Sequence, residues 1–114
     1  MTTNHTLYIG ASQHMKQIND CTIDLVVTSP PYPMIEMWDE IMSDQNPQIK
    51  KYIESEPEKA FELMHQELDM VWKECFRVIK TGGFMCINIG DATRTVNGCF
   101  SLYNNHSRIA KACM

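Results

Sequence analysis

The chain has 114 residues, of which 44% are hydrophobic and 21% are charged, and its formal net charge is −4. This length accommodates one small domain, and no apolar run approaches the roughly 20 residues that span a bilayer, which argues against a membrane protein. The first residues also lack the basic start and apolar stretch of a signal peptide, so we expect a soluble, cytoplasmic protein.

The first segment with a structural pattern lies near the N-terminus. Residues 7–9 are apolar and predict a short strand. Residues 11–19 predict a short helix, with Met15 and Ile18 facing inward.

A second apolar segment covers residues 24–28 and is rich in β-branched side chains. It shows no alternation with polar residues, which is typical of a strand buried on both faces. Prolines at positions 30, 31 and 33 follow it directly. Because proline has no N–H to donate to a sheet, this strand is predicted to end in a rigid loop.

Residues 34–42 predict a short amphipathic helix or an ordered loop, and residues 43–55 match no element. The clearest helical pattern covers residues 56–80, where apolar side chains recur every three or four positions. These side chains form one stripe: Phe61, Met64, Leu68, Trp72, Cys75, Phe76 and Ile79. Ser55 and Glu58 predict a capping box at the helix start, and Gly82 predicts its end.

Residues 84–89 predict a second buried strand, and the tail predicts a loop followed by a closing helix from Asn105. A strand, a helix and a further strand in this order predict a right-handed crossover and a parallel sheet, and therefore an α/β fold. Ligands of such sheets bind outside the carboxyl ends of the strands. The loops at residues 29–32 and 88–91 are expected to emerge together at that edge.

The distribution of charge and the spacing of the cysteines also bear on the surface of the molecule and on metal binding. Residues 39–74 carry ten acidic and four basic residues, whereas residues 75–114 carry five basic residues and one acidic residue. The first stretch is predicted to be a solvated helical face, and the second is a weak indication of a surface that faces a polyanion. The five cysteines are widely spread and predicted to be reduced and mostly buried, and no cysteine or histidine spacing indicates a metal site.

The loop after residues 24–28 carries the most specific chemistry. Residues before proline favour extended backbone, so the loop directs the Ser29 hydroxyl and the Pro30 carbonyl outward, with the Tyr32 ring behind them. Two acceptors beside an aromatic face suit a planar ring that bears an exocyclic amine, such as a nucleobase turned out of its duplex. The same chemistry also fits a simple loop, or a Pro-Pro-Tyr ligand for a partner domain.

The sequence Thr28-Ser29-Pro30-Pro31-Tyr32 after an apolar strand resembles the catalytic motif of the amino-group DNA methyltransferases. Residues 7–10, 75–83 and 84–91 resemble other elements of that family in the same order, and the resemblance spans about residues 7–110. In this family the serine form of the motif is typical of enzymes that act on cytosine N4. Aspartate or asparagine in its place is typical of enzymes that act on adenine N6.

The resemblance implies a partial Rossmann-like parallel sheet of the class I methyltransferases with flanking helices. It implies S-adenosylmethionine as the cofactor and double-stranded DNA as the partner. Ser29 and Pro30 would accept hydrogen bonds from the target amine, with Pro31 in the same motif, and Tyr32 would stack on the base. Thr28 and Ser29 would lie near the methyl donor.

Five further residues bear on the resemblance. Asn88 stands where some relatives place an acidic group that meets the base. Asp91 is either a catalytic carboxylate or a cap for the next turn. His106 and Arg108 match a late family element, although capping or packing explains them equally well. Ala11 stands where relatives often carry aspartate, so no polar role is expected there.

The glycine-rich F-x-G-x-G signature of the cofactor site does not occur in the sequence. The order of motifs resembles the permuted subclass, in which the catalytic motif comes first. Residues 1–114 are therefore expected to be the N-terminal, catalytic-motif portion of a restriction–modification methyltransferase, without its glycine loop and target-recognition region. By itself this portion is expected to be inactive and to pair with a second subunit or a second copy through exposed strand edges. The alternatives are an interaction module that uses Pro-Pro-Tyr and a methyltransferase that acts on RNA or protein.

Overall fold

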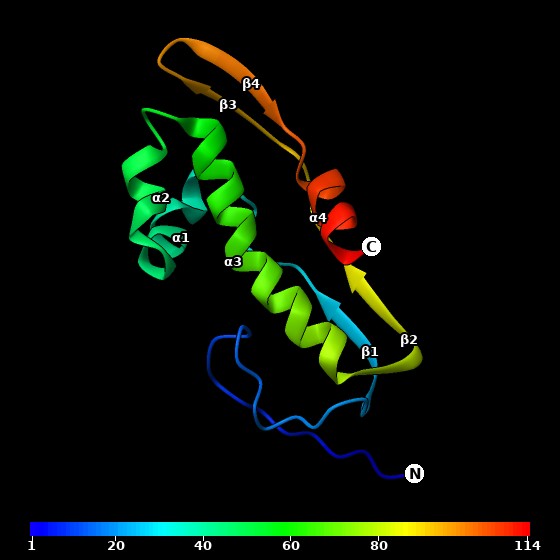
Figure 1. The fold of residues 1–114 in the computed structure, drawn as a ribbon. Coiled ribbons are helices and arrows are strands. Elements are labelled where there is room, and N and C mark those ends of the chain that lie inside the picture. Colours follow the sequence, from blue (N-terminus) through cyan, green and yellow to red (C-terminus); the bar gives the residue numbers. More distant parts are fainter.

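The computed structural model describes residues 1–114 as an elongated α/β structure of 57 × 24 × 23 Å (Figure 1). Its elements, in chain order, are β1 (Ile23–Thr28), the 3-10 helix η1 (Glu36–Trp38), α1 (Asp39–Gln45), α2 (Pro47–Tyr52), α3 (Pro57–Val78), β2 (Ile79–Ile87), β3 (Ala92–Val96), β4 (Cys99–Tyr103) and α4 (Asn105–Cys113). None of the helices combines the length and the apolar character that a membrane crossing requires.

Strands β1 and β2 form a two-stranded parallel sheet, as the strand–helix–strand pattern predicted. Leu25 lies opposite Phe84, and Thr28 lies opposite Ile87. Helix α3, which connects the two strands, runs from the α1–α2 end of the molecule along this sheet (Figure 1). The connection brings the carboxyl ends of both strands to the same edge.

The core lies beside that edge. Twelve buried residues form it: Met34, Met42, Ile49, Ile53, Ala60, Met64, Leu68, Trp72, Cys75, Ala92, Tyr103 and Ile109. Met34 and Ala92 closely follow the two loops at the carboxyl edge, Ile53 caps the end of α2, and the remaining members come from α1 to α4 and β4. One face of the sheet also packs against this core, through Val26 and Met85. Burial is therefore concentrated where the two loops meet the helices.

The predicted bounds of α3 need correction. Ser55 and Glu58 form no capping box, since Glu56 occupies the cap position without a side-chain hydrogen bond and the Ser55 hydroxyl donates to the Lys51 carbonyl. The helix ends at Val78, before Gly82, because the next residue already pairs with β1. Gly82 lies inside β2 with a φ of +82°.

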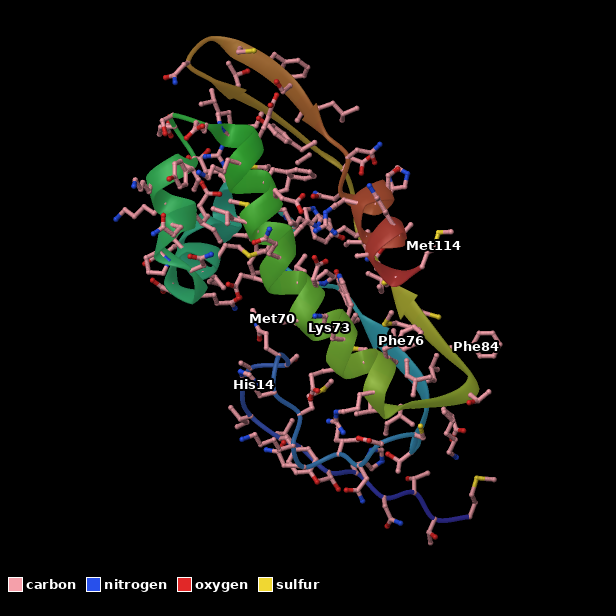
Figure 2. The ribbon with its side chains drawn as sticks, viewed as in Figure 1. His14, Met70, Lys73, Phe76, Phe84 and Met114 are labelled. Carbon is pink, nitrogen blue, oxygen red and sulfur yellow. The ribbon has the colours of Figure 1, made fainter.

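The apolar stripe of α3 was predicted well except at two positions. Ile79 lies beyond the helix, as the first residue of β2. Phe76 is 71% exposed, although its spacing predicted burial. Figure 2 shows the position of its ring near the sheet end of α3.

Two irregular residues of β2 have a steric explanation. The pairing of β1 with β2 shifts in register between Ile23 and Leu25, opposite the Gly82–Gly83 step. A Cβ atom on Gly83 would lie 2.6 Å from Ile79 Cγ2 and 3.0 Å from the Asp24 carbonyl oxygen. Only glycine allows β1 to approach β2 this closely at the bulge.

The N-terminal predictions were wrong. Residues 7–9 form no strand, and Leu7 and Ile9 are 85% and 94% exposed, because no sheet edge pairs with them. Residues 11–19 form turns instead of a helix. The Met15 carbonyl accepts from the Ile18 amide, which closes a turn, and the carbonyls of Met15 and Ile18 also accept hydrogen bonds from the distant Arg77 guanidinium. Both side chains are nevertheless half-buried, as predicted.

The tail contains a β-hairpin where a loop was predicted. Strands β3 and β4 pair in antiparallel fashion, and Asn97 and Gly98 form the turn with φ values of 52° and 77°. Asn-Gly between two β-branched or aromatic runs is the usual sequence of such a turn. The predicted closing helix is confirmed from Asn105 onward.

Charge and cysteine placement also differ from expectation. Of the five basic residues after position 74, four form ion pairs within the chain: Arg77 with Asp20 and Glu74, Lys80 with Asp24, Arg94 with Asp39, and Arg108 with Glu62 and Asp69. The positive charge of this region is thus largely neutralised internally, which removes the indication of a polyanion surface. All five cysteines are free, as predicted, but only Cys75 is buried.

Candidate active site

The two predicted site loops lie together at the carboxyl edge of the β1–β2 sheet. The Asn88 amide donates to the Thr28 carbonyl at 2.9 Å, which continues the parallel pairing beyond both strands. Ser29 follows directly on one side of this bond, and Gly90 and Asp91 follow on the other. The sequence-based expectation that the loops share an edge is confirmed.

Ser29 and Pro30 present two acceptors without partners. The Ser29 side chain is exposed, and its hydroxyl makes no hydrogen bond within the chain. Pro30 is buried, and its carbonyl accepts no hydrogen bond from any backbone or side-chain donor of the chain. The prolines themselves offer no N–H, so local pairing cannot satisfy these groups.

Tyr32 packs against the second loop. Its ring is half-buried, and a Cβ atom on Gly90 would lie 3.4 Å from Tyr32 Cε2. The Tyr32 carbonyl accepts from the Ile35 amide at 3.1 Å, which closes the turn after the three prolines. Met34 within this turn has a φ of +67° and is 1% exposed. Burial of the Met34 side chain maintains a backbone conformation that is unfavourable by itself.

A buried asparagine connects the two loops. Asn105 Nδ2 donates to the Pro33 carbonyl at 3.0 Å and to the Gly90 carbonyl at 3.1 Å. Its Oδ1 lies 2.8 Å from His65 Nε2. Both Asn105 and His65 are 0% exposed.

Sequence analysis missed both residues of this pair. His65 does lie on the apolar face of α3, one turn after Phe61, which was the available signal. Its surroundings are apolar, and the Phe61 ring meets the imidazole edge-on at a centroid distance of 4.6 Å. Burial lowers the pKa of His65, because desolvation penalises the charged imidazolium.

Asp91 is engaged at the start of α4. Its carboxylate accepts from the His106 amide at 3.1 Å and lies 2.9 Å from His106 Nδ1. These hydrogen bonds lower the pKa of Asp91. The structure thus places the Asp91 carboxylate against the first turn of α4, where it accepts from the His106 amide, and not against the turn that follows Asp91 in the sequence.

Arg108 links two helices. Its guanidinium contacts the carboxylates of Glu62 and Asp69 on α3 in bidentate geometry, at 2.8–3.1 Å. These ion pairs raise the pKa of Arg108 and fix α4 against α3. Packing therefore explains Arg108, and Ala11 lies exposed in a turn of the N-terminal segment.

Asn88 is exposed directly after β2, and its side chain makes no hydrogen bond within the chain. Thr28 is half-buried at the end of β1, where its Cα lies opposite that of Ile87. Thr28 directly precedes Ser29 in the chain, and the hydrogen bond from the Asn88 amide to the Thr28 carbonyl brings Asn88 to the same place.

A groove that could hold a ligand lies elsewhere in the molecule. It has a volume of about 660 Å³ between α3 and α4, and Trp72, Phe76, Arg108 and Met114 are among its lining residues. None of the residues predicted to bind the target base lines it. The site loops instead form an open surface at the sheet edge. No cluster of three or more His, Cys, Asp or Glu side chains is arranged to hold a metal ion.

Comparison with known proteins agrees with this arrangement. A family model described as DNA methylase, of the N6/N4 methyltransferase type, matches residues 23–112. The chain belongs to this DNA methylase family. The matched region includes the Thr28–Tyr32 motif, both site loops, and the His65–Asn105 pair.

Two curated relatives are of the same kind. The chain is 49% identical over 121 residues to the type II methyltransferase M.MjaI of Methanocaldococcus jannaschii, and this alignment covers 96% of the chain and 40% of the relative. It is 47% identical over 110 residues to the type II methyltransferase M.MthZI of Methanothermobacter thermautotrophicus, with 95% and 31% covered.

One solved structure has a similar fold. It is that of a candidate DNA modification methylase from Thermus thermophilus, with a TM-score of 0.68, 27% sequence identity, and coverage of 96% of this chain and 39% of that one. The chain thus spans about a third to two fifths of the length of the proteins it matches.

Proposed function

We propose that this DNA methylase chain forms the target-base-binding part of an S-adenosylmethionine-dependent methyltransferase that methylates the exocyclic N4 of a flipped cytosine. The observation that carries the proposal is the pair of unpartnered acceptors, Ser29 Oγ and the Pro30 carbonyl, in the same loop as Tyr32. Residues 1–114 would then be the catalytic-motif portion of the enzyme. A restriction–modification system is the proposed context, because both curated relatives are type II methyltransferases.

The two acceptors match the chemistry of an exocyclic amine. Such an amine is a poor nucleophile, because its lone pair is delocalised into the ring. Hydrogen bonds from the NH2 group to Ser29 Oγ and the Pro30 carbonyl localise that pair and stabilise the positive charge that develops during attack. In-line positioning provides the remainder of the rate enhancement, and no covalent enzyme intermediate is required.

Tyr32 and Asn88 complete the proposed base site. The Tyr32 ring provides a stacking face for the extrahelical base. The ring lies close to Gly90 of the second loop, since a Cβ atom on Gly90 would lie 3.4 Å from Tyr32 Cε2. Asn88 lies where its amide can meet the edge of the base. Asp91 belongs to the proposed site only through the loop that it caps, since its carboxylate is engaged with His106.

The chain's residues fit one wall of a methyl-donor site. S-adenosylmethionine, when bound, supplies an electrophilic methyl group. Thr28 and Ser29 lie at the carboxyl end of β1, and the edge of β1 that faces away from β2 pairs with no strand. A neighbouring strand with a glycine-rich loop would fit along this free edge. The two strands would then belong to a larger Rossmann-like sheet with helices on its faces.

The outer face of the sheet supports the same proposal. Leu25, Val27 and Phe84 are 53%, 73% and 71% exposed on the face opposite the core. An apolar sheet face of this kind is normally covered by another layer. We propose that further segments of the enzyme, a second subunit or a second copy of the chain cover it. By itself the chain would then have no methyltransferase activity and little affinity for S-adenosylmethionine.

Double-stranded DNA is the proposed partner of the complete enzyme. The net charge of −4 and the internal ion pairs leave few cations for phosphates among these residues. In the complete enzyme, residues outside 1–114 are therefore expected to make most of the contacts with DNA phosphates.

Two alternatives remain testable. Adenine N6 is the second candidate target, because the acceptors suit any exocyclic amine and only the serine at position 29 favours cytosine. A docking role for Pro-Pro-Tyr has less support, because Pro30 and Pro33 are buried and the loop is not displayed as an extended peptide.

The experiment that tests the proposal is nucleoside mass spectrometry of DNA treated with the methyltransferase that contains this chain. N4-methylcytosine is the expected product. If N6-methyladenine is the only product, the proposed target base is wrong. If the DNA stays unmodified under saturating S-adenosylmethionine, the proposed function is wrong. The isolated chain, titrated with S-adenosylmethionine in a calorimeter, is expected to give no measurable heat of binding.

A further inference from the structure

The side chain of Asn105 spans the two loops of the candidate site. Its contacts reach Pro33, 72 residues earlier in the chain, and Gly90, 15 residues earlier. We propose that Asn105 is a positioning residue that holds the target-base loop and the Asn88–Asp91 loop in fixed register, with His65 fixing the orientation of its amide. This inference rests on the proposed function and deepens it.

Chemistry alone decides the orientation of the Asn105 amide. The Pro33 and Gly90 carbonyls accept hydrogen bonds and cannot donate them, so both must face the NH2 group of Asn105. Its oxygen then faces His65 Nε2 at 2.8 Å, and His65 must carry its hydrogen on Nε2. The polar atoms of this unit therefore have a single consistent arrangement.

The surroundings of the second ring nitrogen, Nδ1, determine the tautomer of His65. His65 Nδ1 is buried and has no hydrogen-bond partner. A hydrogen on Nδ1 would leave an unpaired N–H in an apolar core, which is unfavourable. The tautomer with hydrogen on Nε2 is thereby strongly preferred. His65 serves as a fixed donor to Asn105 and does not act as an acid or base.

Asn105 is free for this role because its neighbour performs the capping. Asn104 Oδ1 accepts from the Ser107 amide at 3.3 Å and caps α4. The two carbonyls that Asn105 connects belong to Pro33, directly after Tyr32, and to Gly90, which contacts the Tyr32 ring. Loss of the connection would allow the stacking ring and the acceptors of the first loop to move relative to the second loop.

The most discriminating test is the substitution Asn105→Asp. It keeps the shape of the side chain but removes its two N–H donors. The carboxylate would face two carbonyl oxygens and repel them. Asn104→Asp is the matched control, since it makes the same change one residue earlier and aspartate is an equally good N-cap. The rates of amide hydrogen exchange, measured by mass spectrometry on the 114-residue chain, are compared between the wild type and both variants.

We expect amides in residues 32–35 and 88–91 to exchange at least about 10-fold faster in Asn105→Asp, while α3 and the end of α4 keep their protection. Asn104→Asp is expected to keep both loops protected. Acceleration in one loop only, or in neither, would overturn the proposal. If Asn105→Asp does not fold, Asn105→Ala is judged by the same criteria, because it removes the donors without adding a charge.

A second readout separates positioning from simple stabilisation. In the methyltransferase that contains this chain, Asn105→Ala should lower the single-turnover rate of methyl transfer by about 100-fold, with DNA affinity and KM for S-adenosylmethionine little changed. His65→Gln, which retains a donor to Asn105, should lose much less activity than His65→Leu. A wild-type turnover rate for Asn105→Ala would refute the positioning role. If the wild-type enzyme transfers no methyl group, the proposed function fails, whereas the exchange experiment still decides whether Asn105 connects the loops.

Discussion

The β1–β2 sheet has two contrasting regions, its carboxyl end and its outer face. At the carboxyl end the two loops are cross-connected through Asn105, and the polar side chains of Asn105 and His65 beneath them are fully buried. On the outer face, Leu25, Val27 and Phe84 expose more than half of their surface, although all three are apolar. Figure 2 shows the Phe84 ring directed away from the ribbon.

This contrast shows that hydrophobicity alone does not decide which side chains are buried in this chain. Asn105 and His65 are buried because three segments meet there and satisfy their hydrogen bonds. Phe84 is exposed because no segment of these residues reaches the outer face. The candidate base site is thus assembled within residues 1–114, whereas the sheet that carries it has one face without cover.

The largest effect is expected at Ser29, in the methyltransferase that contains this chain. Ser29→Ala removes an acceptor for the target amine and should lower turnover by about 10²–10³-fold, with little loss of DNA binding. Single-turnover methyl transfer measures this effect. Ser55→Ala, at a serine whose hydroxyl donates only to the Lys51 carbonyl, is the control and should behave as wild type. An unchanged rate for Ser29→Ala would remove the hydroxyl from the mechanism.

A smaller effect is expected at Tyr32. Tyr32→Ala should weaken retention of the extrahelical base by about 1–3 kcal/mol, the usual contribution of one stacked aromatic ring. Tyr32→Phe should be tolerated, because the Tyr32 hydroxyl has no hydrogen-bond partner in the chain. A 2-aminopurine reporter at the target position should lose its flipping signal in the alanine variant only. Equal damage from both variants would assign the role to the hydroxyl.

The contrast between the two sheet faces can be tested at adjacent residues of β2. Met85 packs against the core, whereas Phe84 is 71% exposed. Met85→Ala should lower the free energy of unfolding by about 2 kcal/mol, near the lower limit for such truncations, because Met85 is only half-buried. Phe84→Ala should change it by less than about 0.5 kcal/mol and should reduce self-association. Urea unfolding and light scattering measure the two quantities, and the opposite order of effects would contradict the assignment of the faces.

The smallest effect concerns the N-terminal segment and pH. Hydrogen bonds from Arg77 and from the Met15 amide lower the pKa of Glu74 from 4.5 to about 2. Since the folded-state pKa is depressed, the stabilisation is present above about pH 4.5 and is lost as the pH falls toward 2. Glu74→Gln should therefore show a smaller decrease in melting temperature between about pH 6 and pH 3 than wild type. Glu40→Gln, at an exposed glutamate without an ion pair, should keep the wild-type decrease.

Local patterns predicted the elements whose stability depends on their own periodicity. Strand β1 and, apart from Phe76 and Ile79, the apolar stripe of α3 appear where they were expected, and their order along the chain predicted the parallel sheet. The prediction that the first strand is buried on both faces was wrong, because Leu25 and Val27 are 53% and 73% exposed. The Thr28–Tyr32 motif likewise predicted the loop that carries the candidate acceptors, because three prolines allow few other conformations.

In the N-terminal segment and at the end of α3, contacts with distant residues determine a structure that differs from the one the local pattern predicts. Residues 11–19 have helical spacing, yet Arg77 binds two of their carbonyls, and residues 7–9 find no strand to pair with. The end of α3 at Val78, four residues before Gly82, follows from the pairing of the next residue with β1.

By itself the sequence determined the α/β class, the parallel strands and the placement of Ser29, Pro30 and Tyr32 at the edge of the sheet. Each of these follows from residues that are neighbours in the chain. Only the tertiary structure decided that Asn105 and His65 connect the two loops, and that Asp91 caps α4. The groups in the Asn105 unit are separated by up to 72 residues, and a buried amide is stable only where all its partners converge. That convergence depends on how α3, α4 and both loops pack together, which no local pattern encodes.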